Sequence, residues 1–352
     1  MVTPARTLVA MLVDPAGAQA LNDAGWTGVL AVARAEQLIG SLATRLDGLD
    51  LPPQVRAVLA DAKATALEGR RQALWEAEMA RRALHGLGAP LILLKGTAFA
   101  AAGLDAGQGR SIGDLDILVP HASLTAVEEA LLAHGWMWVK PDPYDDAYYR
   151  QWMHELPPLI HPERDRMIDV HHTILPPTAR MTPDAAKLIA RAVPLRNGLA
   201  MLSPPDMVVH AAIHLFGDGD LSGGLRNLWD IDRLLREFSE NDGDFWIALS
   251  AAATEHEAAV VVARAVRLSH DLFATPVPDA WARLGTADRW YRRRLLARDG
   301  WGRATRPAMR LAFYVRSHWL RMPPAMLARH LWIKWRKTAG DREPAPPPAE
   351  HR

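Results

Sequence analysis

The feature that most constrains this chain is an acidic–apolar alternation, Asp114-Leu115-Asp116-Ile117, within a strand expected over residues 112–119. Side chains of a β-strand alternate between its two faces, so Asp114 and Asp116 share one face. Two carboxylates this close repel and raise each other's pKa unless a cation lies between them. Because Mg²⁺ prefers oxygen ligands, the pair is a candidate magnesium site. The alternative is an exposed edge strand with one solvated acidic face.

The residues before this strand add a second feature. An apolar run at 91–94, short enough for a buried strand, leads into the turn Lys95-Gly96-Thr97. A segment of small residues follows and is expected to be helical, and a glycine-rich loop then carries Arg110. A turn that enters a helix can bind phosphate through its backbone N–H groups. This turn therefore favours a functional site over a solvated acidic surface.

A hairpin expected downstream supplies a third carboxylate. Its strands are predicted at 156–161 and 166–172, with Asp169 and His171 on the same face of the second strand. Asp169 is a candidate because a two-metal site needs acidic groups that converge from different segments. His171 and His172 could contact a phosphate or the acceptor, or could be hydrogen-bonded structural histidines.

Together these parts resemble the nucleotidyltransferase superfamily of the DNA polymerase β type. Its signature is an apolar strand, a turn of Gly with Gly or Ser, and an acidic-apolar-acidic-apolar strand, here Gly96-Thr97 and residues 114–117. The Leu-Lys-Gly start, Arg110 and the Ile-Asp-Val-His segment at 168–171 are closer to one bacterial family of uncharacterised nucleotidyltransferases, often found with surface-polysaccharide and exosortase gene clusters. Thr97 in place of Ser or Gly, and a longer spacer before the acidic strand, depart from the superfamily pattern.

The resemblance covers roughly residues 72–273 and implies an α+β fold. A polymerase β-like nucleotidyltransferase core, a mixed sheet with helices, would be flanked by N-terminal and C-terminal helical regions. The expected boundaries are an N-terminal helical region at 1–88, the core at 89–175, a proline-rich connector at 176–204, a helical domain with a basic tail at 205–340, and a disordered end at 341–352.

The resemblance also implies a metal-dependent enzyme that moves a nucleoside monophosphate from an NTP, with ATP as one expectation, to a hydroxyl or phosphate acceptor. The catalytic residues and metal ligands for Mg²⁺ or Mn²⁺ would be Asp114, Asp116 and Asp169. The nucleotide-binding residues would be Lys95, Gly96, Thr97 and Arg110. The alternative is a non-catalytic nucleotide- or partner-binding protein on the same fold, in which Thr97 and the long spacer mark lost turnover.

The amino-acid composition limits which partners and which cellular location are expected. The net charge of +1 gives no overall field that favours nucleic acid or membrane, and the absence of Cys excludes disulfides and thiol catalysis. The tail from Arg289 is rich in Arg and Trp, which suits an anionic membrane surface, nucleic acid to a lesser degree, or ordinary helix packing. The expected location is cytoplasmic, with peripheral contact at the inner membrane face through 289–338.

Elsewhere the sequence predicts mostly helices. Apolar residues keep helical spacing from Val29 to Leu49. Residues 141–150 are expected to be a polar surface loop, which could also line a substrate mouth. His210 and His214 are four residues apart on a helix expected over 206–216 and could share a metal ion. No carboxylate ligand is evident for them, which favours a helix packed near the active-site cleft.

Overall fold

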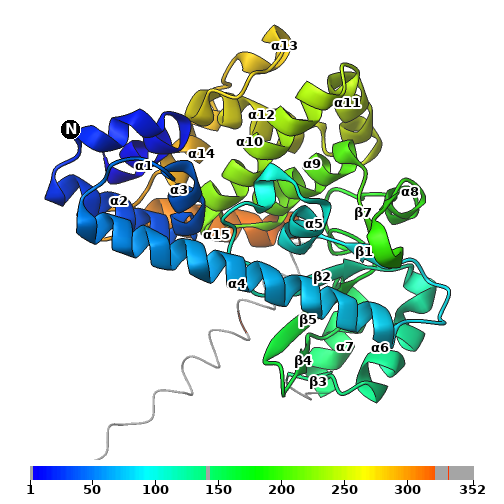
Figure 1. The fold of residues 1–352 in the computed structure, drawn as a ribbon. Coiled ribbons are helices and arrows are strands. Elements are labelled where there is room, and N and C mark those ends of the chain that lie inside the picture. The colour runs from blue at the N-terminus through cyan, green and yellow to red at the C-terminus, as the bar shows by residue number, and fades with distance from the viewer. Residues whose placement is uncertain (1–2, 140–142, 322–331, 333–352) are drawn as a thin grey trace, which may run out of the picture.

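The computed structural model describes residues 3–139, 143–321 and 332, and it contains a seven-stranded sheet, whose labelled strands lie toward the lower right of Figure 1. The strands follow the order β3-β4-β5-β2-β1-β7-β6. They are β1 (Ile92–Leu93), β2 (Leu115–Leu118), β3 (Met137–Trp138), β4 (Leu159–His161), β5 (Arg166–His171), β6 (Val193–Pro194) and β7 (Ala200–Met201). The β2–β5 and β1–β7 pairings are parallel, and the other four are antiparallel. The expected mixed sheet with helical flanks is confirmed.

The register between β2 and β5 decides which side chains meet. Asp116 is paired with Asp169, and Ile117 is paired with Val170. Paired residues of neighbouring strands project to the same face of a sheet, so the two aspartates lie side by side. Ile117 and Val170 project to the opposite face, where both are buried. Asp114 lies just before β2 rather than inside the strand predicted for it.

The N-terminal helices are connected to the sheet by one long helix. They are α1 (Pro4–Val13), the 3-10 helix η1 (Pro15–Ala20), α2 (Asp23–Ala35), α3 (Ile39–Arg45) and α4 (Pro53–Ala83). Helix α4 runs from the other N-terminal helices to the sheet (Figure 1). The helical spacing predicted from Val29 to Leu49 is interrupted, because Gln37 has a left-handed backbone conformation with φ of 55°. The neighbouring Glu36 is buried and pairs with Arg298 at 2.7 Å.

The helices of the core lie between its strands in the sequence. They are α5 (Lys95–Ala102), α6 (Leu124–Ala133) and α7 (Pro143–Trp152), with 3-10 turns η2 (Asp105–Gly107) and η3 (His121–Ser123). The surface loop predicted at 141–150 is wrong where the structure describes it, since Pro143–Trp152 is helical. Arg150 accounts for this helix, because it bonds Asp146 one turn earlier at 2.9 Å and Glu128 of α6 at 2.8 and 2.9 Å.

The proline-rich segment at 176–204 does more than connect. It contains α8 (Ala185–Ala190), the 3-10 turn η4 (Arg196–Gly198) and the strands β6 and β7. Strand β7 pairs in parallel with β1, with Ala200 opposite Ile92, so this segment extends the sheet. Pro194 is tolerated in β6 because an edge strand has no outer neighbour to receive a hydrogen bond.

A helical region follows the sheet. It comprises α9 (Pro204–Ile213), the π-helical turn η5 (His214–Asp218), α10 (Gly224–Asn241), α11 (Phe245–Glu255), α12 (Ala259–Phe273), α13 (Asp279–Ala282), α14 (Asp288–Leu295) and α15 (Pro307–Arg321). Ser203 caps α9 by accepting a hydrogen bond from the backbone N–H of Asp206. In the part of the chain that the structure covers, no helix combines the length and apolar character needed to cross a membrane. The prediction for 341–352 lies outside the described residues.

Candidate active site

Three carboxylates converge where β2 and β5 pair. Asp114 precedes β2, Asp116 lies within it, and Asp169 occupies the paired position on β5. One carboxylate oxygen of each residue lies within 4.8 Å of the other two. Asp116 is buried, Asp169 is half-buried and Asp114 is exposed, so the cluster can be reached from solvent. A donor set made of oxygens alone suits a hard divalent cation such as Mg²⁺.

The three carboxylates differ in their electrostatic surroundings. Burial, and then the negative charges of Asp116 and Glu155, raise the pKa of Asp169 to about 7. Burial would also raise the pKa of Asp116, but the charge of Lys95 and a hydrogen bond from His171 outweigh it and hold that pKa well below its usual range. Asp116 is therefore ionised at neutral pH, whereas Asp169 is close to half-protonated when no cation is present.

Lys95 neutralises Asp116 directly. The Lys95 ammonium donates a hydrogen bond to Asp116 Oδ1 at 2.6 Å, and His171 Nε2 lies 3.0 Å from the same oxygen. Lys95 is predicted to contact the phosphates, but here its ammonium group is paired with the Asp116 carboxylate. Lys95 also has a left-handed backbone with φ of 48°, which costs a non-glycine residue roughly 1–2 kcal/mol. Strain of this kind is concentrated at functional positions.

The predicted phosphate turn is the first turn of α5. Lys95, Gly96 and Thr97 carry the N–H groups that lack a partner at the start of a helix, and no side chain caps this end. Thr97 is buried, and its hydroxyl has no hydrogen-bond partner among the described residues. The turn lies beside the acidic cluster, because Lys95 reaches Asp116 from it. These unpaired donors and the helix dipole favour an anionic group.

Arg110 lies against the phosphate turn, but its charge is already paired. Its side chain packs so closely on Gly96 that a methyl group at Gly96 would collide with Arg110 Nε. The Arg110 guanidinium forms an ion pair with Asp230 on α10, which Arg226 also binds at 2.7 Å. Arg110 therefore fixes the turn against α10 and places a partly exposed positive charge beside it.

Two residues next to the acidic cluster have no role in the sequence analysis. His154 and Glu155 reach His171 because Glu155 and His171 form an isolated antiparallel backbone bridge. One ligand atom of each of these three residues lies within 4.8 Å of the other two. The signal in the sequence is the His-Glu pair immediately before the hairpin that carries Asp169. His171 itself is a hydrogen-bonded histidine, which is one of the two alternatives predicted for it.

Helix α9 lies beside the same site. His210 is buried, and its pKa is lowered by burial and then by the charge of Lys95, with His214 and His171 also near. Among the described residues, neither His210 nor His214 belongs to a group of three metal-ligating side chains. This agrees with a helix packed near the cleft.

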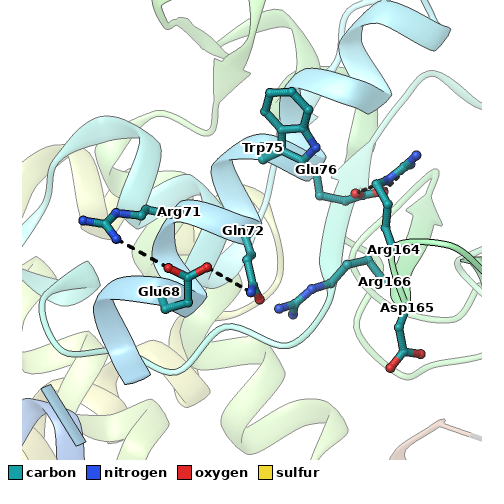
Figure 2. Close-up of a pocket in the computed structure, with 8 residues that line it drawn as sticks. All are labelled: Glu68, Arg71, Gln72, Trp75, Glu76, Arg164, Asp165 and Arg166. Carbon is teal, nitrogen blue, oxygen red and sulfur yellow. Dashed lines mark hydrogen bonds and ion pairs between the residues drawn. The ribbon is translucent and has the colours of Figure 1, made fainter. Parts of the chain in front are cut away.

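A groove of about 690 Å³ opens between α4 and the β4–β5 hairpin (Figure 2). Trp75 of α4 lines it and is 56% exposed. Arg166 of β5 also lines it and donates a hydrogen bond at 3.1 Å to the carbonyl of Gly113, the residue before Asp114. Figure 2 shows the Arg164 side chain turned toward Glu76, to which it is bonded at 2.7 Å. The exposed ring of Trp75 and the guanidinium of Arg166 therefore line this groove, and Arg166 connects it to Gly113, the residue next to Asp114.

Comparison with known proteins agrees with this geometry. A family model described as an uncharacterised nucleotidyltransferase matches residues 22–274, which is more than half of the chain. No curated protein matches, and no solved structure matches. The matched range includes the sheet, the acidic cluster and the first turn of α5. The chain therefore belongs to this family of nucleotidyltransferases, enzymes that transfer phosphorus-containing groups.

Proposed function

We propose that this protein transfers a nucleoside monophosphate from an NTP to a hydroxyl or phosphate acceptor in a metal-dependent reaction that releases pyrophosphate. One observation carries the proposal: the β2–β5 register brings Asp114, Asp116 and Asp169 to within 4.8 Å, beside the uncapped first turn of α5. A metal-bound NTP suits this arrangement, because the carboxylates can bind its metal ion and the N–H groups can bind its phosphates.

The three carboxylates fit Mg²⁺ or Mn²⁺ in chemistry and in charge. Asp114, Asp116 and Asp169 would hold the ion, which would offset both the burial and the neighbouring negative charges that raise the pKa of Asp169. When bound, the metal would neutralise the triphosphate and stabilise the attacking and leaving oxygens. Lys95 would turn from Asp116 to the phosphates when the ion is bound, because its side chain is 25% exposed.

The remaining roles belong to the turn and to Asp169. The N–H groups of Gly96 and Thr97 would hold phosphate oxygens, and Arg110 would add positive charge beside them. Asp169 would also help to deprotonate the acceptor hydroxyl, because it is a half-buried carboxylate that the acceptor can reach. The acceptor is proposed to belong to surface-polysaccharide systems, on the strength of the resemblance alone.

The direct test incubates the full-length protein with each α-labelled NTP, Mg²⁺ or Mn²⁺, and cell extract. We expect one extract component to become labelled, and the Asp116→Asn variant to label nothing. Asp50→Asn is the matched control, because Asp50 is an exposed aspartate far along the chain from the site. Nucleotide binding without any labelled product would instead favour the non-catalytic binder.

A second proposal concerns the tail, where the exposed surface of α15 favours contact with an anionic membrane. Leu311, Val315 and Trp319 follow one face of this helix at four-residue spacing and are 63%, 44% and 44% exposed. Arg306 and Arg310 are exposed nearby. Aromatic and aliphatic side chains among arginines are typical of interfacial helices.

A negative charge introduced on this face tests the membrane proposal more cleanly than deletion, because Thr178 and Arg180 bond to the end of α15. We expect Leu311→Glu to weaken binding to vesicles that contain anionic lipid, at low salt, and to leave nucleotide binding unchanged. Ile247→Glu is the control, since Ile247 is an exposed apolar residue on a different helix, α11. Absence of vesicle binding by the wild-type protein would remove the proposal.

A further inference from the structure

A second group of potential metal ligands lies next to the carboxylates, formed by His154, Glu155 and His171. The backbone brings it together, because residues 154–156 run antiparallel to the end of β5. Leu156 N–H donates to Val170 O at 2.9 Å, and His172 N–H donates to His154 O at 2.9 Å. Two imidazoles and one carboxylate from these segments thus meet with their ligand atoms within 4.8 Å.

The distances within this group suit a shared cation better than hydrogen bonds. Glu155 Oε2 lies 3.4 Å from His171 Nδ1 and 3.7 Å from His154 Nε2. Zinc bonds of 2.0–2.1 Å in tetrahedral geometry place neighbouring ligand atoms about 3.4 Å apart. His171 Nδ1 is buried and has no hydrogen-bond partner among the described residues. A buried ring nitrogen without such a partner is costly unless something else binds there.

The hydrogen bond to Asp116 decides which nitrogen of His171 faces Glu155. His171 Nε2 lies 3.0 Å from Asp116 Oδ1, an oxygen that also accepts a hydrogen bond from Lys95 at 2.6 Å. When Nε2 donates to this carboxylate, Nδ1 is left facing Glu155 Oε2 at 3.4 Å as the nitrogen that a metal ion can bind. The Asp116–His171 bond is also the carboxylate–histidine arrangement that orients metal-bound imidazoles.

We propose that His154, Glu155 and His171 bind a divalent transition-metal ion of the zinc type, next to and distinct from the Asp114–Asp116–Asp169 site. Two histidines and a glutamate form a known zinc ligand set that leaves one position for water or substrate. The Glu155 side chain is 19% exposed, so the ion can enter from that side. Nitrogen ligands favour Zn²⁺ over Mg²⁺, so each of the two neighbouring sites would select its own ion.

The site would act through Asp116. A cation on His171 Nδ1 makes the Nε2–H a stronger donor to Asp116 Oδ1, so zinc would hold Asp116 ionised and oriented after Lys95 moves away. His171 is in this sense a positioning residue. Zinc binding itself needs no nucleotide and no transfer activity, so its test stands apart from the test of the proposed function.

The test measures zinc on the full-length protein after dialysis against chelator. We expect one Zn²⁺ per chain by calorimetry, retained in Asp114→Asn, and an affinity at least about 100-fold weaker in His154→Ala because a direct ligand is lost. His85→Ala, at an exposed histidine beyond α4, is the control and should bind as the wild type does. Unchanged zinc affinity in a folded His154→Ala variant would overturn the proposal.

A measurement on the wild type covers the case in which His154→Ala fails to fold. X-ray absorption at the zinc edge should show two imidazole rings and oxygen ligands around the ion. An all-oxygen environment would place zinc on the aspartates and overturn the proposal, as would a wild-type protein that binds no zinc.

Discussion

Lys95, on the first turn of α5, donates a 2.6 Å hydrogen bond to the buried oxygen Asp116 Oδ1. The ammonium thus occupies a position that a metal ion on Asp116 would contest. Burial opposes the charge on Lys95, but Asp116 and then the other aspartates raise its pKa above the usual value. In the metal-free protein the Lys95 ammonium therefore neutralises the charge of Asp116.

Replacement of Lys95 should lower the stability of the metal-free protein and raise its affinity for Mg²⁺. We expect Lys95→Ala to destabilise the metal-free protein by about 3–5 kcal/mol, because Asp116 is left buried without its partner. Mg²⁺ should recover part of that loss and should bind more tightly than to the wild type, since no ammonium competes. Thermal melting with EDTA and with Mg²⁺ measures both effects. A Lys95→Ala variant as stable as the wild type in EDTA would contradict the ion pair.

Removal of the Asp116 carboxylate should remove the metal dependence. In the wild type we expect Mg²⁺ or Mn²⁺ to raise nucleotide affinity, and in Asp116→Asn we expect affinity to be the same with and without metal. Filter binding of labelled NTP measures this, and circular dichroism shows whether the variant is folded. A folded Asp116→Asn variant that retains the full metal effect would sink the site assignment.

Asp169 should make the metal-free protein less stable as the pH rises. Its pKa is raised from 3.8 in the unfolded chain to about 7 in the folded one, so the folded state holds an extra proton between these values. The stability that this proton supports is fully present below about pH 4 and is lost as the pH rises through 7. Asp169→Asn should therefore gain stability over the metal-free wild type as the pH rises.

The gain is bounded by the pKa shift. At about 1.4 kcal/mol per pKa unit it reaches at most about 4 kcal/mol, and less because the side chain is only partly buried. Urea unfolding in EDTA at pH 4 and pH 8 provides the comparison, with Asp50→Asn as the control. A difference in stability that does not change with pH would show that the pKa of Asp169 is not raised in the folded protein.

With metal present, we expect Asp169→Ala to keep nucleotide affinity within a few-fold while transfer falls by orders of magnitude.

Gly96 should resist even a methyl group. Alanine ordinarily stabilises a helix relative to glycine by about 1 kcal/mol. At Gly96 the methyl would displace Arg110 and weaken its ion pair with Asp230, so we expect Gly96→Ala to cost about 1–3 kcal/mol instead. Gly17→Ala is the matched control, because a methyl there meets no other atom within 4 Å. A stabilised Gly96→Ala variant would show that Arg110 can move aside at no cost.

The sequence could predict the parts of the site that depend on local patterns. Strand alternation places Asp114 and Asp116 on one face, and the mixed sheet with helical flanks follows from the family resemblance. The meeting of Asp116 with Asp169 depends on a strand register, which local patterns do not specify. The sequence predicts Asp169 on a strand of a separate hairpin, and the pairing of that strand with β2 is seen only in the folded chain.

The features that differ from the sequence predictions all depend on contacts between residues that are far apart in the sequence. The sequence predicts a loop at 141–150 because Glu128, the partner of Arg150, lies beside it only when α6 and α7 are packed. Lys95 was assigned to phosphate because nothing near it in the sequence indicates Asp116. The ligand group of His154, Glu155 and His171 forms through backbone pairing with β5. Propensity carries no information on such contacts.

The parallel pairing of β2 with β5 also has a consequence for how the protein folds. Asp116 and His171 are 55 residues apart in the chain, and α6, β3, α7 and β4 lie between their strands. Contacts of such high sequence separation form slowly, because a long loop must close before they stabilise anything. We therefore expect the cation sites to form only after β2 and β5 have paired. A divalent ion present during synthesis would bind only chains that have completed this step, and would thereby keep them from unfolding.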